Sequence, residues 1–111
     1  MNIEFNIYKL KPDSDTYEKW SKQKYMQQEI DREIVIVGEE TVGNKLYLKG
    51  CTIREKGLCL IGGLMLNDVA YLIPEEDIER TSLIEQYDIP KKYLTMEIVE
   101  DIQRINERLF A

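Results

Sequence analysis

The sequence contains no histidine, and this absence removes several kinds of chemistry at once. Histidine is the commonest general base and the commonest metal ligand, and the Ser/His/Asp and Cys/His catalytic arrangements depend on it. The chain has only two cysteines, Cys51 and Cys59, and two cysteines alone do not close a structural zinc site. Carboxylates such as Glu75, Glu76 and Asp77 leave one route to metal binding or acid/base chemistry, but acids at a helix start are explained by the helix dipole and by solvation. We therefore expect no metal, no cofactor and no enzymatic activity.

Targeting signals and membrane-spanning runs are also lacking. The least polar stretch, LCLIGGLMLNDVAYLI (58–73), includes Asn67 and Asp68 and is too short to cross a bilayer as a helix. The first ten residues alternate between apolar and polar, unlike the basic start and apolar block of a signal peptide. We expect a cytoplasmic protein in which both cysteines stay reduced. The heavy use of Ile, Glu and Lys suggests a bacterial or phage genome rich in AT.

What is present is typical of a globular domain. The chain has 111 residues, of which 43% are hydrophobic and 32% are charged, a balance that favours folding over disorder. No repeat, linker or low-complexity segment divides it, so we expect one domain over residues 1–111.

The first third predicts a strand followed by a helix. Strict alternation over residues 2–10 predicts a half-buried strand, which we place at an edge of the sheet. A helix is predicted to begin at Asp15, which fits a capping box with Glu18, with Asp13 or Ser14 as the alternative cap, and to run to about Glu29. Its apolar face is thin, which suggests that it lies on a sheet rather than inside a core.

Residues 33–53 read as a hairpin. Gly43-Asn44 supplies the positive φ that a two-residue turn requires, and it places Val42 opposite Lys45. Continuing this register places Ile36 opposite Cys51. Residues 34–37 are apolar on both faces, which predicts a central strand covered on both sides.

The apolar stretch predicts two further strands, 58–66 and 69–73, joined at Asn67-Asp68 and paired with each other. Gly62-Gly63 indicates a bulge or bend, with close approach of a ligand as the alternative. The length of the turn that precedes residue 58 leaves open whether Cys51 and Cys59 face each other.

Two helical segments are predicted to complete the chain. Pro74 with the acids after it is typical of a helix start, which gives one or two short helices before Pro90. Apolar residues spaced by four, three and four predict a second helix over about 95–110. The fold class expected is α+β: strand, helix, four strands and two helices, with about five strands in one antiparallel sheet and the helices mainly on one of its faces.

Charge and aromatic residues provide the candidate sites. The formal net charge is −6, and residues 75–88 hold six acids against Arg80 alone. Such a surface repels nucleic acid and membranes and attracts a basic partner. Tyrosine and tryptophan are frequent in interaction sites, although packing on the sheet is the simpler role for those of the first helix. The candidate interaction residues are Glu75, Glu76, Asp77, Glu79, Tyr17, Trp20, Tyr87 and Tyr93.

The resulting hypothesis is a small acidic module that binds a basic protein surface, as an inhibitor, immunity protein or adaptor. Two alternatives stay open: a nucleic-acid mimic that blocks a DNA- or RNA-binding protein, and a small-ligand-binding domain. Self-association through a strand edge is compatible with all three.

Overall fold

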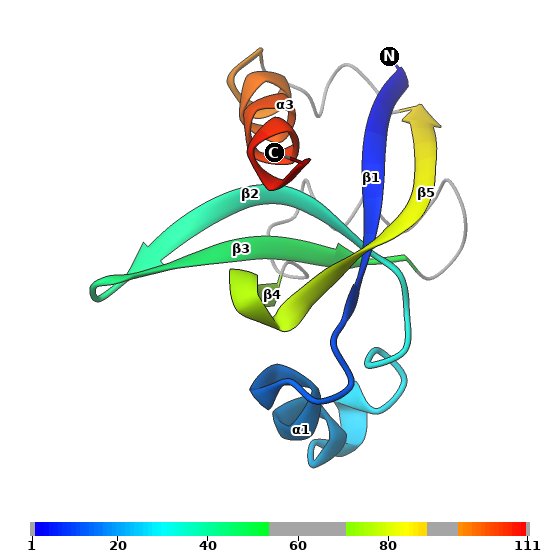
Figure 1. Ribbon diagram of the computed structural model, residues 1–111, viewed down its shortest axis with the longest axis vertical. Helices are drawn as coiled ribbons and strands as arrows, with labels where there is room; N and C mark the ends of the chain where they lie inside the picture. The colour runs from blue at the N-terminus through cyan, green and yellow to red at the C-terminus, as the bar shows by residue number, and fades with distance from the viewer. Residues whose placement is uncertain (1, 54–70, 89–95, 111) are drawn as a thin grey trace.

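A computed structural model describes residues 2–53, 71–88 and 96–110 (Figure 1). The elements are β1 (Asn2–Leu10), α1 (Asp15–Ser21), the 3-10 helix η1 (Lys24–Met26), β2 (Ile34–Val42), β3 (Lys45–Thr52), β4 (Tyr71–Pro74), the 3-10 helix η2 (Glu75–Asp77), β5 (Ile78–Asp88) and α3 (Met96–Phe110). The five strands form one antiparallel sheet in the order β4-β3-β2-β1-β5. This confirms the predicted α+β class.

The sheet is strongly curled. Strands β4 and β5 stand at opposite ends of the strand order, yet only the three residues of η2 separate them in sequence. A connection that short brings the two ends of the sheet toward each other. Figure 1 shows the result, with β1 and β5 crossing the direction of β2 and β3.

Strand β1 lies inside the sheet, so its predicted position at an edge is wrong. It pairs with β2 on one side, where Tyr8 is opposite Ile34, and with β5 on the other. Phe5 and Asn6 are both buried although successive side chains point to opposite faces. The strand is therefore covered on both faces, which a simple alternation of apolar and polar residues does not reveal.

Helix α1 is shorter than the sequence predicts. It begins at Asp15, where the hydroxyl of Ser14 accepts a hydrogen bond from the backbone N–H of Tyr17 at 3.1 Å, and it ends at Ser21. The chain continues through η1 instead of reaching Glu29 as a helix. Since the side chains that α1 buries are only those of Thr16 and Trp20, tertiary packing does not extend it further.

The hairpin forms as predicted, but its register slips at one residue. Val42 lies opposite Lys45, and Gly43 adopts a φ of 64°. A bulge between Ile36 and Gly38 then shifts the pairing, so that Ile36 faces Gly50 rather than the predicted Cys51. The central position of β2 is confirmed, because residues 34–37 are buried on both faces.

The segment after the hairpin differs most from the prediction. Strand β4 pairs directly with β3, with Leu48 opposite Ile73, whereas the sequence predicts pairing of residues 69–73 with 58–66. The predicted strand over 58–66 lies outside the described residues. Residues 78–88 form β5 instead of a helix, because pairing along β1 satisfies their backbone. Helix α3 is confirmed over Met96–Phe110. The predictions for Cys59, Gly62-Gly63 and the turn at Asn67-Asp68 lie outside the described residues.

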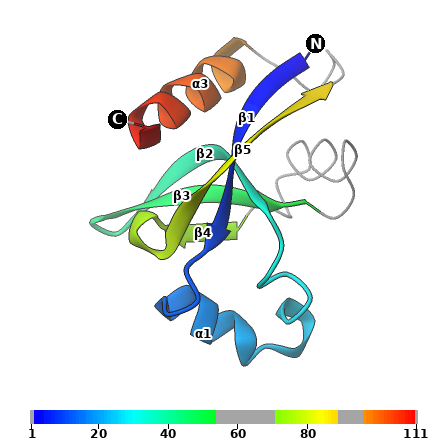
Figure 2. The same ribbon diagram turned by 45° about the vertical axis from the view of Figure 1, so that its right-hand side comes forward.

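Both helices contribute to one buried cluster. Trp20 of α1 and Ile105 of α3 belong to the same hydrophobic cluster as Ile34 and Ile36 of β2. Helix α3 packs mainly on β2, and Figure 2 shows α1 and α3 on either side of the curled strands. The core therefore holds the C-terminal end of α3 close to β1, β2 and η2.

Candidate functional site

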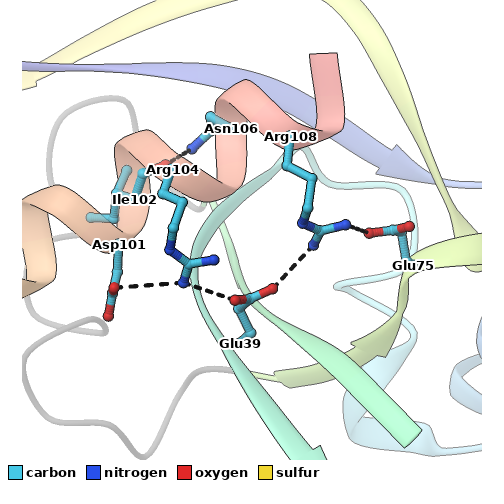
Figure 3. Close-up of polar contacts among 7 residues, drawn as sticks. All are labelled: Glu39, Glu75, Asp101, Ile102, Arg104, Asn106 and Arg108. Carbon is cyan, nitrogen blue, oxygen red and sulfur yellow. Dashed lines mark hydrogen bonds and ion pairs between the residues drawn. The ribbon is translucent and has the colours of Figure 1, made fainter. Parts of the chain in front are cut away.

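Two arginines of α3 face the sheet and meet one carboxylate of β2 (Figure 3). Arg104 Nη2 lies 2.8 Å from Glu39 Oε1, and Arg108 Nη2 lies 3.1 Å from Glu39 Oε2. Arg108 also donates through Nη1 to Glu75 of η2. The hydrogen bond to Glu39 raises the pKa of Arg104, and the hydrogen bond to Glu75 is the main cause that raises the pKa of Arg108. These contacts tie α3 to β2 and η2.

The spacing of these residues follows from regular structure. Arg104 and Arg108 are four residues apart and so lie one helical turn from each other on the same side of α3. Successive side chains of a strand point to opposite faces, so Glu39 turns toward α3 while Glu40 is exposed.

A buried polar group lies beneath the same end of α3. The Oδ1 atom of Asn106 accepts hydrogen bonds from Asn6 Nδ2 at 3.3 Å and from the Tyr8 hydroxyl at 3.4 Å. Asn106 Nδ2 donates to the carbonyl of Ile102 at 2.7 Å. Polar groups buried in this way fix the position of a helix, since leaving any of them unpaired is costly.

A cavity of about 300 Å³ opens beside this group, between β1, η2, β5 and α3. Tyr8 lines this cavity, although only 2% of the surface of Tyr8 is exposed. Burial raises the pKa of Tyr8, while the nearby positive charges of Arg80 and Arg108 act in the opposite direction. The lining residues are Tyr8, Glu75, Ile78, Arg80, Arg108 and Leu109.

The predicted acidic residues divide between structural and exposed positions. Asp77 is buried and accepts hydrogen bonds from Thr16. Glu76 is exposed and forms an ion pair with Lys45 at 2.8 Å, and this hydrogen bond lowers the pKa of Glu76. Glu79 is exposed on β5, opposite Lys9 of β1. Glu75 is the member of this set that reaches the cavity.

The predicted aromatic residues do not gather into one site. Trp20 is buried against Tyr71, with ring centroids 5.0 Å apart, so the packing role is confirmed for it. Tyr17 is half-buried, and the hydrogen bond that it donates to Asp31 raises its pKa. Tyr87 stands on β5 opposite Ile3. Its side chain and the whole of Tyr93 lie outside the described part of the chain.

Helix α3 also carries three glutamates with exposed side chains. Glu97, Glu100 and Glu107 are exposed, and their spacing of three and seven residues places them on one side of the helix. None of the three forms an ion pair with another residue that the structure describes. We call these three residues the acidic face of α3.

Sequence reasoning did not single out Tyr8, Arg80 or Arg108. The charges of residues 89–111 balance, which concealed that Arg104 and Arg108 form ion pairs with Glu39 and Glu75 outside this segment. The available signal was the four-residue spacing of Arg104 and Arg108 beside an apolar stripe. Nothing local to either segment indicated that Arg108 meets Glu75.

No three carboxylate or thiol side chains converge on a metal-sized position within residues 2–53, 71–88 and 96–110. In that part of the chain, no helix combines the length and apolarity needed to cross a membrane. No protein-family model, curated protein or solved structure matches this chain.

Proposed function

We propose that this chain is a non-enzymatic protein-interaction module that binds a basic surface of another protein, in the manner of an inhibitor, an immunity protein or an adaptor. The observation that supports the proposal is that the acidic face of α3 is exposed and forms no ion pair with another described residue. The neighbouring Arg104 and Arg108 form ion pairs with Glu39 and Glu75 instead. An unpaired acidic face speeds association with a basic partner and repels nucleic acid.

The acidic segment around η2 has a smaller part in this proposal than its composition suggested. Glu75 and Glu76 are each ion-paired within the chain, and Asp77 is buried. Binding a partner through these residues requires that existing ion pairs are first broken. The acidic face of α3 has no ion pair to break among residues 2–53, 71–88 and 96–110, so we place the first contact with the partner there.

The test compares three forms of the chain as baits, and circular dichroism first confirms that all three are folded. The chain, its Glu97→Gln/Glu100→Gln/Glu107→Gln variant and a control with Glu4→Gln, Asp13→Asn and Glu40→Gln are each used to capture proteins from source cells. All six side chains are exposed, and both variants remove three negative charges. We expect a stoichiometric basic partner with the chain and with the control. The α3 variant should associate about tenfold more slowly.

Further measurements separate the alternatives. Equal association of both variants with the partner would contradict the role of α3. Displacement of DNA or RNA from the captured partner would instead identify nucleic-acid mimicry. Capture of the chain by itself, with a doubled mass in light scattering, would replace the proposal by self-association.

A further inference from the structure

Near the turn that joins β2 to β3, one face of the sheet has no buried side chain. Residues directly opposite each other in a sheet share a face, and the face alternates along each strand. The register therefore collects seven side chains here: Glu40 and Val42 of β2, Lys45, Tyr47 and Lys49 of β3, and Leu72 and Pro74 of β4. All seven are exposed or half-buried. We call these seven residues the outer face of the hairpin, whose tip extends beyond both helices (Figures 1 and 2).

Three apolar side chains form a diagonal line across this outer face. Val42 on β2 and Leu72 on β4 are each two residues from the position directly opposite Tyr47, one toward the turn and one away from it. Diagonal neighbours of this kind are about 7–8 Å apart, within reach of long and aromatic side chains. Val42 and Leu72 nevertheless expose 50% and 39% of their surface. A contiguous apolar line left in solvent is typical of a protein contact site.

The outer face is electrically neutral in a chain of formal net charge −6. Two lysines, Lys45 and Lys49, stand against Glu40 and against Glu76 of η2, which pairs with Lys45 at 2.8 Å. Two copies of an acidic chain repel each other in general, but this part of their surface does not add to the repulsion. Glu40 and Lys45 lie on opposite sides of the apolar line. The face is therefore complementary in charge to a second copy of itself.

We propose that two copies of this chain pair through the outer face of the hairpin, about a two-fold axis that follows the line of Val42, Tyr47 and Leu72. In such an isologous contact the apolar line of one copy lies on the same line of the other. The rotation also exchanges the two sides of the line, so that Glu40 of each copy lies near Lys45 of the other. Sheets pack face to face at about 10 Å, a gap that side chains of this size fill.

This contact does not involve the acidic face of α3. Helix α3 meets β2 from the other side of the sheet, where Glu39 pairs with Arg104, and Glu39 and Glu40 point to opposite faces. The proposed dimer therefore does not depend on the proposed function. Capture of a second copy together with a basic partner would support both proposals. Capture of a second copy without a basic partner would remove only the proposed function.

The test measures the mass of the purified chain by analytical ultracentrifugation as its concentration rises. We expect an equilibrium between one and two copies with a Kd of about 1–100 μM. Val42→Arg should weaken dimerisation at least about tenfold, because it places a charge in the apolar line of both copies. Leu46→Arg is the matched control and should leave the Kd unchanged. Leu46 lies on the same hairpin and is 45% exposed, but it points to the opposite face.

An exchange of charges tests the position of the two-fold axis. Glu40→Lys and Lys45→Glu should each weaken dimerisation about tenfold, because like charges then meet across the contact. An equal mixture of the two variants should form mixed dimers about as tightly as the unchanged chain, since every lysine at these positions again meets a glutamate. Both variants should stay folded, as judged by circular dichroism, because the ion pair of Lys45 with Glu76 is exposed and contributes little to stability.

Several results would overturn the proposal. A mass that stays that of one chain up to about 1 mM would exclude the dimer. Equal weakening by Val42→Arg and Leu46→Arg would show that the outer face of the hairpin is not the contact. Mixed charge variants that associate no more tightly than either variant alone would contradict the two-fold axis.

Discussion

The carboxylate of Asp77 accepts two hydrogen bonds from Thr16, one from the backbone N–H at 3.1 Å and one from the hydroxyl at 2.6 Å. Thr16 lies in the first turn of α1, where backbone N–H groups have no partner within the helix. Asp77 therefore supplies from η2 a partner that the helix itself lacks. The two residues are 61 positions apart, so this contact joins the start of α1 to the connection between β4 and β5.

Asp77→Ala is expected to lower the free energy of unfolding by about 2 kcal/mol, because it leaves two buried donors without their charged acceptor. Asp77→Asn should cost less, since the amide oxygen can still accept. The measurement is urea unfolding followed by circular dichroism. In a double-mutant cycle with Thr16→Val, the two losses should not add; full additivity would contradict a direct interaction.

Gly50 is predicted to resist substitution because two core side chains occupy the space of a Cβ atom. An added Cβ would lie 2.9 Å from Ile34 Cγ2 and 2.9 Å from Ile73 Cδ1. Gly50→Ala should therefore destabilise the protein by about 1–3 kcal/mol. Ile73→Val in the same chain removes the Cδ1 atom and should recover part of this loss.

Gly38→Ala is the matched control for Gly50→Ala. A Cβ at Gly38 meets the Lys49 side chain at an ordinary 3.4 Å, and that flexible side chain can move. Both glycines lie in strands, so the conformational entropy of the unfolded chain changes similarly in the two variants. Equal losses in thermal unfolding would show that the contacts at Gly50 have no special effect.

The sequence correctly predicted those elements that are determined by residues close together in the chain. The turn at Gly43 and the apolar spacing of α3 each depend on a few neighbouring residues, and both were found correctly. The bulge before Gly38 could not be predicted in the same way. Because residues 34–37 are apolar on both faces, a slip of one residue there exposes no polar side chain and leaves no trace in the pattern.

Strand β5 shows how a misleading local signal arises. Pro74 followed by three acids is typical of a helix start, and in the structure these acids form only the single turn η2. The strand that follows is stabilised by pairing with β1, whose residues lie 68 to 86 positions earlier, from Leu10 opposite Ile78 to Asn2 opposite Asp88. The cavity depends on the same kind of distant contact, since Arg108 and Glu75 are 33 residues apart.

Trp20→Ala is expected to cost about 3–5 kcal/mol, because Trp20 fills the core with only 6% of its surface exposed and packs on Tyr71. Tyr25→Ala is the comparison: Tyr25 is 76% exposed, and its loss should change stability by less than about 0.5 kcal/mol. Urea unfolding by circular dichroism measures both. Similar losses in the two variants would contradict the packing of α1 against the core.

Stability should fall at alkaline pH because of Tyr8. Burial is the main cause that raises its pKa in the folded protein above the ordinary value of 10.0. Above about pH 10 the unfolded chain loses this proton while the folded protein keeps it, so a rise in pH favours unfolding. The contribution of the protonated Tyr8 hydroxyl to the free energy of unfolding is fully present below about pH 10, and it is lost as the pH rises through the pKa of Tyr8 in the folded state.

The Tyr8→Phe variant tests this directly, because phenylalanine has no proton to lose. At neutral pH it should be less stable by about 0.5–1.5 kcal/mol, since the hydrogen bond to Asn106 is gone. Between pH 9 and about 11, however, its free energy of unfolding should decrease less steeply than that of the unchanged chain. Tyr25→Phe is the control, because it removes a tyrosine hydroxyl from a side chain that is 76% exposed. Parallel pH curves for the chain and Tyr8→Phe would show that the Tyr8 hydroxyl titrates alike in the folded and unfolded states.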